Sequence, residues 1–344
     1  MTSLIIYIVV IIISTIVVWK SSDLLETSSQ KLASYYKLPE VVQGAIITAI
    51  GSSFPELSTT VLSTLIHGEF ELGVGAIVGS AIFNILMIPA LSGLVSKKLD
   101  ADRILIYKDA QFYITSVAVL LLTFSLAVIY NPVEGKELVG EMTRSIALIP
   151  LLLYVLYIFL QQQETSDYQK EGTDDHDVSD IKPGKEWLKL LGSLVLIVAG
   201  VEGLVRGSLF LGEYLNTPSF FWGITVIAAA TSIPDAFVSV KMARHGKGMI
   251  SLANVIGSNI FDLLVAIPVG VLIAGSSEID FALAVPLMLF LTFATILLFA
   301  MMRTKLGINH LESWILLIVY ALFVLWMILE TFGDMSWLRE SQAA

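Results

Sequence analysis

Two stretches of this chain repeat one polar pattern inside otherwise apolar sequence, and they constrain the fold more than any other feature. The first stretch, residues 44–84, reads GAIITAIGSSFPELSTTVLSTLIHGEFELGVGAIVGSAIFN. The second, residues 223–262, reads GITVIAAATSIPDAFVSVKMARHGKGMISLANVIGSNIFD. Each is apolar enough to enter a bilayer, yet each carries an acid, a proline and several hydroxyls at the depth of the hydrocarbon. The chain therefore encodes one polar site twice.

The composition places these stretches in a membrane protein. Hydrophobic residues make up 56% of the 344 residues, charged residues 15%, and the mean hydropathy is +0.82. These values are typical of a polytopic membrane protein rather than of a soluble domain. A net charge of −10 argues against nucleic acid as a partner. Without cysteine, disulfides, thiol catalysis and thiolate metal sites are excluded, and nothing in the sequence indicates an obligatory protein partner.

Apolar runs of roughly 20 residues, each long enough to cross about 30 Å of hydrocarbon, predict ten transmembrane helices. They are expected at 3–22, 40–66, 70–96, 110–130, 145–161, 187–210, 219–243, 249–274, 281–301 and 312–331. The first run lacks the basic start and cleavage site of a signal peptide, so it is interpreted as a span. The first and sixth helices are expected to be longer than the bilayer requires.

The lysines and arginines predict the orientation of these helices. Sixteen of the 20 follow odd-numbered spans, and cytoplasmic loops are enriched in Lys and Arg. Both termini should therefore be extracytoplasmic. The short loop between the halves favours a prokaryotic plasma (inner) membrane as the location.

The repeat predicts the architecture. Six pairs share an offset of 179 residues: Asp23 and Glu202, Pro39 and Pro218, Gly44 and Gly223, Ser53 and Ser232, Pro55 and Pro234, Glu56 and Asp235. Because each copy holds five helices, an odd number, the second copy must enter the membrane inverted. The predicted fold is an all-α polytopic membrane protein of two inverted five-helix repeats, 1–161 and 187–344. The acidic segment 162–186 is expected to be a cytoplasmic linker.

Three acids inside predicted spans point to a polar cavity. Glu56, Asp235 and Asp262 would each cost roughly 2.5–3.5 kcal/mol at the centre of a bilayer, so they should not face lipid. Hydroxyl and amide residues share their helix faces, since spacings of three or four residues place side chains on one face. These groups are Ser52 and Ser53 with Glu56, Thr231 and Ser232 with Asp235, Ser80 with Asn84, and Ser258 with Asp262.

The prolines predict further oxygen ligands. Pro55 and Pro234 should break their helices and free the carbonyls of Gly51 and Ala230. Carboxylate, hydroxyl, amide and carbonyl oxygens suit hard cations such as Ca²⁺, Mg²⁺, Na⁺ or K⁺. All four histidines fall in or near predicted loops, which argues against zinc. A purely structural role for the buried acids is the alternative, and Glu202 with Arg206 is interpreted as a structural ion pair.

The motifs GSSFPE with GSAIFN, and ATSIPD with GSNIFD, resemble the paired alpha repeats of the cation/calcium exchanger superfamily, the sodium/calcium exchangers. The resemblance implies a central ion site on the second, third, seventh and eighth helices, across which the first and sixth slide. It implies that Glu56 and Asp235 hold Ca²⁺ and that Na⁺ competes for the same two carboxylates. The further ligands it implies are Ser52, Ser53, Ser80, Asn84, Thr231, Ser232, Ser258, Asp262 and the carbonyls of Ala49 and Ala228.

The expected function is secondary antiport of Na⁺ for Ca²⁺ by alternating access, without enzymatic activity or a cofactor. Asp262 is the residue type of the potassium-dependent branch, so co-transport of K⁺ stays open. An antiporter for Mg²⁺ or another divalent cation, or exchange coupled to H⁺, is the alternative. A cation channel and an intramembrane protease are further rivals. Such proteases need either a catalytic acid pair in a GxGD setting or a serine with a membrane histidine, and the sequence has neither.

Overall fold

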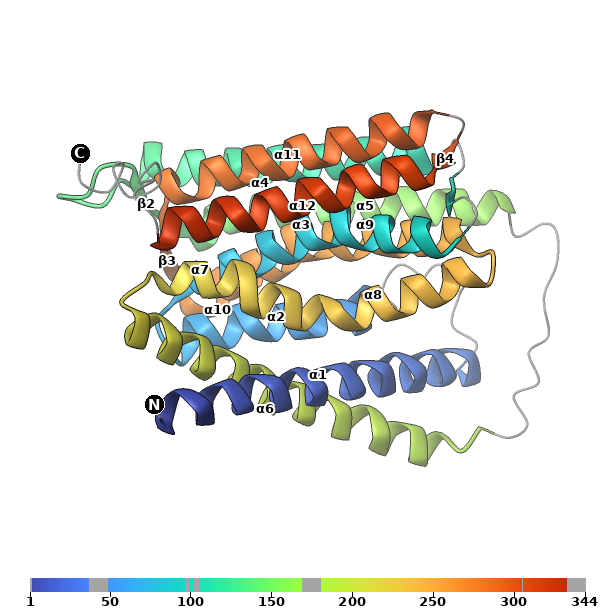
Figure 1. The fold of residues 1–344 in the computed structure, drawn as a ribbon, viewed down its shortest axis with the longest axis horizontal. Helices are drawn as coiled ribbons and strands as arrows, with labels where there is room; N and C mark the ends of the chain where they lie inside the picture. The colour runs from blue at the N-terminus through green and yellow to red at the C-terminus, as the bar shows by residue number, and fades with distance from the viewer. Residues whose placement is uncertain are drawn as a thin grey trace.

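The chain folds as a bundle of long helices that run in one common direction (Figure 1). The computed structural model describes residues 2–36, 49–96, 99–101, 105–168, 181–304 and 306–332. The helices of the first half are α1 (Thr2–Tyr35), α2 (Ala49–Leu65), α3 (Phe70–Val95), η2 (Leu105–Asp109) with α4 (Ala110–Tyr130), and α5 (Arg144–Tyr168). Those of the second half are α6 (Pro183–Leu215), α7 (Ser219–Trp222) with η3 (Gly223–Ile227) and α8 (Ala228–Arg244), α9 (Gly248–Phe261) with η4 (Asp262–Ala266) and α10 (Ile267–Ala274), α11 (Phe281–Arg303), and α12 (His310–Phe332).

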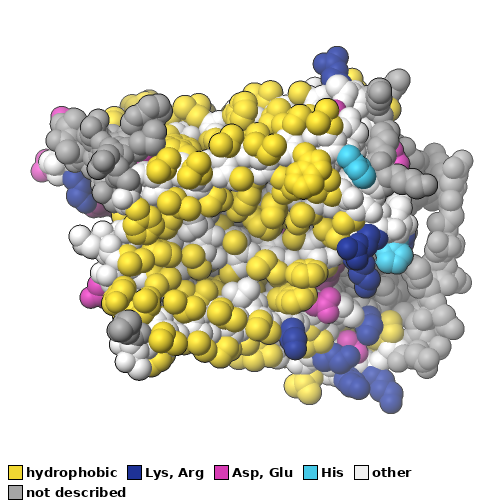
Figure 2. Space-filling model, viewed as in Figure 1, with side chains coloured by type: hydrophobic (Ala, Val, Ile, Leu, Met, Phe, Trp, Pro, Cys, Tyr) yellow, Lys and Arg dark blue, Asp and Glu magenta, His cyan; other side chains and the backbone are white. Residues whose placement is uncertain are grey.

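The ten expected helices are confirmed. Nine of them are, within the described residues, long and apolar enough to cross a membrane; the described part of α2 has only 17 residues. At 1.5 Å per residue, α1 with 34 residues and α6 with 33 are each about 50 Å long, well beyond the hydrocarbon thickness. Figure 2 shows hydrophobic side chains covering the middle of the visible face, with Lys and Arg mostly near one end. The chain is an integral membrane protein.

Helix α3 forms the centre of the bundle. It is apolar all round, and 89% of its most apolar window is buried, compared with 11% for α1. A helix that is hydrophobic on every face must be surrounded by other helices. α3 packs against α2, η3, α8 and α12, so both repeat stretches meet along it.

The two longest helices, α1 and α6, form a separate layer at the bottom of Figure 1. Glycines on α6 permit their close approach: a Cβ at Gly200 would lie 2.8 Å from the Val18 side chain, and one at Gly203 or Gly207 would overlap α1 side chains. Small residues commonly allow such tight helix crossings in membranes. α1 and α6 therefore pack as one tight pair.

Two small antiparallel sheets join the halves and confirm that the repeats are inverted. β1 (Leu99–Asp100) follows the third helix of the first half and pairs with β4 (Gly307–Ile308), which precedes the last helix of the second half. The reverse combination, β2 (Val139–Thr143) with β3 (Ser276–Asp280), forms the other sheet. Figure 1 places β2 and β3 at one end of the bundle and β4 at the opposite end. Equivalent strands of the two halves therefore lie at opposite ends of the bundle. This arrangement requires a two-fold axis perpendicular to the helices.

The expectation that the prolines break their helices is wrong. Pro55 lies inside α2 and Pro234 inside α8, and both helices continue through them. The irregular turns lie elsewhere, at the π-helical segments Gly223–Ile227 and Asp262–Ala266. A helix can accommodate a proline by adjusting neighbouring turns to a wider geometry, so the site is not built on a helix interruption.

The boundaries of the predicted linker also shift. α5 continues to Tyr168, seven residues into the predicted segment 162–186, and α6 begins at Pro183. Proline at the first position of a helix is favoured because its missing N–H would have no partner there. The acidic centre of the linker, 169–180, lies outside the described residues.

The crossing of α3 with η3 gives a stability prediction. A Cβ at Gly79 would overlap the Ile224 carbonyl and lie 2.8 Å from the Ala228 Cβ, and backbone cannot yield as a side chain can. Gly79→Ala should therefore cost about 1–3 kcal/mol and lower the apparent melting temperature in detergent. Gly257 is its counterpart in the repeat and has open space around it, so Gly257→Ala is the matched control. Equal melting of the two variants would contradict the close approach.

Candidate cation site

Two serine–serine hydrogen bonds lie where the repeat stretches cross. Ser53 on α2 and Ser258 on α9 are 2.7 Å apart, and Ser80 on α3 and Ser232 on α8 are also 2.7 Å apart. Ser53 corresponds to Ser232 in the repeat, and Ser80 of the motif GSAIFN corresponds to Ser258 of GSNIFD after a shift of one residue in the offset. Each bond therefore joins one half to the other, and the two bonds are symmetry partners. Four of the predicted site residues are brought together in this way.

The three predicted acids are buried at the same crossing. Glu56 is 2% exposed, Asp235 7% and Asp262 0%. Ser80 Oγ donates a long hydrogen bond of 3.4 Å to Glu56 Oε1. Glu56 Oε2 and both carboxylate oxygens of Asp262 have no hydrogen-bond partner among the described residues. Buried carboxylate oxygens without donors are costly unless a cation or water occupies the space beside them.

Asn259 completes the site, and the sequence analysis missed it. Its Nδ2 donates to the Ala81 carbonyl and to Tyr113 Oη, each at 3.1 Å, so its Oδ1 is left to accept from Asn84 Nδ2 at 2.9 Å. This fixes the amide of Asn84, whose Oδ1 is buried and without a described partner. The available signal was the asparagine of GSNIFD, which the comparison of repeats passed over because the first copy has Ala81 there.

The remaining predicted ligands lie around this centre. Thr231 Oγ1 donates to the carbonyls of Ile227 at 3.1 Å and Ala228 at 3.3 Å, so two predicted ligand groups contact each other. Ser52 lines a small cavity beside the predicted acid on α8. Ala49 is the first residue of α2, and its side chain is outside the described set.

The acids are spread through the crossing rather than gathered. Within the described part of the chain, no three His, Cys, Asp or Glu side chains are close enough to hold one metal ion together. A cation here would bind one or two carboxylates and complete its shell with hydroxyl, amide and carbonyl oxygens. Oxygen shells of this kind suit Ca²⁺ and Na⁺.

Glu202 and Arg206 form the ion pair that the sequence predicts. Arg206 Nε lies 2.6 Å from Glu202 Oε1, and His67 Nε2 lies 3.2 Å from Glu202 Oε2. One carboxylate is thus held by two basic side chains. This pair belongs to the α6 side of the bundle and not to the crossing.

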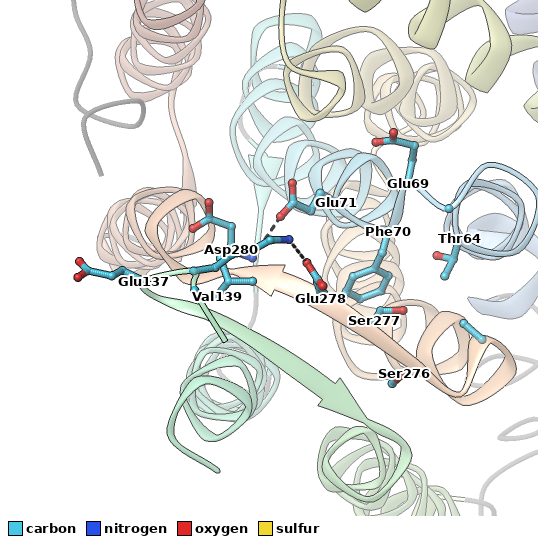
Figure 3. Close-up of a pocket in the computed structure, with 14 residues that line it drawn as sticks. Thr64, Glu69, Phe70, Glu71, Glu137, Val139, Ser276, Ser277, Glu278 and Asp280 are labelled. Atoms are coloured by element: carbon cyan, nitrogen blue, oxygen red, sulfur yellow. Dashed lines mark hydrogen bonds and ion pairs between the residues drawn. The ribbon is translucent and has the colours of Figure 1, made fainter. Parts of the chain in front are cut away.

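A wide acidic pocket of about 910 Å³ opens at the end of the bundle that carries β2 and β3 (Figure 3). Five acids line it: Glu69, Glu71, Glu137, Glu278 and Asp280. Glu71 accepts a hydrogen bond from the Asp280 backbone N–H at 3.2 Å. Lys136 donates to Glu278 at 2.5 Å, which raises the pKa of the lysine. None of the predicted ligands is among the residues that line this pocket.

The asparagine contact yields a binding prediction. Asn259→Ala leaves the Asn84 amide free to rotate, and loss of such outer-shell partners typically costs about 10–100-fold in metal affinity. Ca²⁺ titration of the purified protein by calorimetry would measure the change. Ser116→Ala, on the same helix as Tyr113, removes a hydrogen bond to the Phe112 carbonyl only and should bind as the unmodified chain does. Unchanged affinity in Asn259→Ala would show that this contact does not orient the site.

Comparison with known proteins identifies the family to which the chain belongs. The family model for the sodium/calcium exchanger protein matches residues 6–162 and 185–329. Sodium/calcium exchanger MaX1 of Methanosarcina acetivorans is 25% identical over 92% of this chain and 96% of its own. The sodium–calcium exchanger NCX_Mj superposes with a TM-score of 0.61 at 21% identity, covering 94% of this chain and 99% of its own. The H⁺/Ca²⁺ exchanger CAX gives 0.71 at 17% identity, covering 98% and 85%. The chain belongs to the sodium/calcium exchanger protein family, whose members are transporters and not enzymes.

Proposed function

We propose that this protein exchanges Na⁺ for Ca²⁺ at the crossing of α2, α3, α8 and α9, with Na⁺ entering the cell and Ca²⁺ leaving it. The observation that carries the proposal is the set of buried oxygens without donors: Glu56 Oε2, Asn84 Oδ1 and both oxygens of Asp262. Such oxygens are costly at this depth unless a cation or a water molecule lies beside them, and a cation also offsets the charge of the carboxylates. The relatives named as sodium/calcium exchangers support Na⁺ as the coupling ion.

We assign the ligand roles by position. Glu56 and Asp235 would hold Ca²⁺ and release it when Na⁺ competes for the same carboxylates. The remaining oxygen ligands would come from Ser52, Ser53, Ser80, Asn84, Thr231, Ser232, Ser258, Asp262 and the carbonyls of Ala49 and Ala228. The numerous neutral hydroxyls and carbonyls suit Na⁺, which binds oxygen ligands without needing one carboxylate for each ion.

The coupling of the Na⁺ and Ca²⁺ fluxes follows from the free-energy cost of a site that holds no ion. An empty site would carry uncompensated carboxylates across the apolar interior, which is strongly unfavourable. Either Ca²⁺ or several Na⁺ can neutralise them, so the protein changes its facing direction only when loaded. Because both ions need the same carboxylates, movement of one drives movement of the other in the opposite sense, without ATP or a cofactor.

We also propose the topology. Residues 1–161 and 187–344 would be the two structural units, joined by the cytoplasmic segment 162–186, of which residues 162–168 extend α5 and residues 183–186 begin α6. The distribution of Lys and Arg supports a topology in which both termini lie outside the cytoplasm. The acidic pocket at the β2–β3 end would then face outward, where its negative charge would raise the local concentration of cations.

The direct test is Ca²⁺ uptake into proteoliposomes loaded with Na⁺ and diluted into buffer without Na⁺. Uptake by the unmodified chain should require the Na⁺ gradient, and Glu56→Gln should reduce it by at least about 100-fold, since this change removes a charged ligand from a buried site. Glu213→Gln removes one exposed carboxylate from the end of α6 and should transport normally.

Three further conditions separate the alternatives. Uptake driven by a pH gradient and indifferent to Na⁺ would replace the proposal with H⁺-coupled exchange, the activity that the CAX neighbour is named for. If unlabelled Mg²⁺ inhibits the uptake of labelled Ca²⁺ as strongly as unlabelled Ca²⁺ does, the protein is a less selective antiporter of divalent cations. Uptake that needs K⁺ in the external buffer, together with Ca²⁺, would assign a K⁺ to the site, with Asp262 as its proposed carboxylate.

A further inference from the structure

A second, smaller cavity adjoins the crossing on the side of α1. It has a volume of about 20 Å³ and lies where α1 packs against α2 and α8. Its walls come from all three helices: Trp19, Ser22, Asp23 and Glu26 of α1, Ser52 of α2, and Pro234, Asp235 and Val238 of α8. A water molecule needs about 10–15 Å³ of such space. The cavity therefore has room for one small ion but not for a hydrated one.

The polar groups of this cavity are those of a cation site. Asp23 and Glu26 are three residues apart and share one face of α1, opposite Asp235. Ser22 is 5% exposed, and its Oγ is buried without a hydrogen-bond partner among the described residues. A buried hydroxyl of this kind normally has a protein, water or ion partner. Carboxylates and hydroxyls together are ligands for hard cations.

The repeat shows that these carboxylates differ from their counterparts. Asp23 corresponds to Glu202 on α6, and Glu202 is held by Arg206 and His67. On α1, by contrast, the described contact is neutral: Gln30 Nε2 donates to Glu26 Oε1 at 3.0 Å. Glu202 therefore has basic partners, whereas no ion pair joins Asp23 or Glu26 to a basic side chain among the described residues. A mobile cation is the natural counter-charge for these two carboxylates.

The cavity is also coupled to the central crossing. Asp235 lines this cavity together with Asp23 and Glu26, and it is also one of the buried acids of the central crossing, so it is common to both groups. A cation held by Asp23 and Glu26 would thus be adjacent to one of the acids proposed to bind Ca²⁺. When the cation moved inward, it would exchange the carboxylates of Asp23 and Glu26 for those of Glu56 and Asp235. It would have a negatively charged ligand throughout.

We propose that Asp23, Glu26 and Ser22 of α1, together with Ser52 of α2, form a staging site for a single dehydrated Ca²⁺ or Na⁺, with Asp235 between this site and the central one. As a transport step this rests on the proposed exchange function, but the binding site itself does not. The site lies toward the end of α1 that carries Tyr35, the side assigned to the cytoplasm. It would capture the cation that is to be carried outward.

Trp19 provides a direct readout, because it lines the same cavity and can sensitise the luminescence of a bound Tb³⁺ ion, a surrogate for Ca²⁺. Purified full-length protein should show Tb³⁺ emission that is lost in Trp19→Phe, retained in Glu56→Gln, and competed by Ca²⁺. The double variant Asp23→Asn/Glu26→Gln should bind Tb³⁺ at least about tenfold more weakly, since the charge of the ligands sets the affinity of such sites. Glu213→Gln should match the unmodified chain.

Two results would overturn the inference. One is Trp19-dependent emission with the same Tb³⁺ affinity in the double variant as in the unmodified chain. The other is emission that disappears in Glu56→Gln yet persists in the double variant, which would place the ion at the central site alone. If gel filtration shows the double variant to be misfolded, Asp23→Asn, a change at an exposed side chain, is tested by the same criteria.

Sided transport separates this inference from the proposed function. With Ca²⁺ supplied from the side of the α1 cavity, the double variant should need about tenfold more Ca²⁺ for half-maximal exchange, and with Ca²⁺ supplied from the opposite side it should not. Absence of exchange in the unmodified chain would refute the proposed function while the Tb³⁺ result still decides on the cavity. Exchange with equal Ca²⁺ requirements from both sides would refute the staging role alone.

Discussion

The structure depends on one constraint: carboxylates placed at the depth of lipid must be compensated within the protein. Glu56, Asp235 and Asp262 can lie at this depth only if surrounding helices exclude lipid and supply polar groups. This requirement explains why α3, the most deeply buried of the candidate spans among the described residues, is enclosed on nearly every side, and why hydroxyls from both halves meet beside the acids. The apolar core keeps lipid away from the carboxylates, and the polar crossing supplies their partners, so each depends on the other.

Much of this arrangement could be predicted from the sequence because the bilayer allows so few alternatives. Apolar runs must be helices, and a repeated unit with five helices must invert, so the ten helices and the inverted repeat follow from length and parity alone. The serines and acids of the crossing could be identified because they occur twice, at matching positions. Repetition separated the residues of the crossing from polar residues elsewhere in the chain.

The features that could not be predicted are those in which the two copies differ. Asn259 occupies the position that Ala81 has in the first copy, so a search for residues that match between the copies passes over it. Its side chain nevertheless orients the Asn84 amide. The ion pair of Glu202 gives no hint that Asp23 forms no ion pair with a basic side chain among the described residues. The prolines misled for another reason, because a wider turn nearby can absorb their effect on the hydrogen-bond ladder.

The two small sheets have a mechanical consequence. Backbone hydrogen bonds tie β1 to β4 at one end of the bundle and β2 to β3 at the other, so each half is fastened to the other at both membrane faces. A hinge that opened the halves at either face would have to break a ladder. No described strand is attached to the α1–α6 layer, whose two helices adhere mainly to each other. The helices that the strands join are therefore held together at both ends of the bundle, whereas the α1–α6 layer has no such attachment among the described residues.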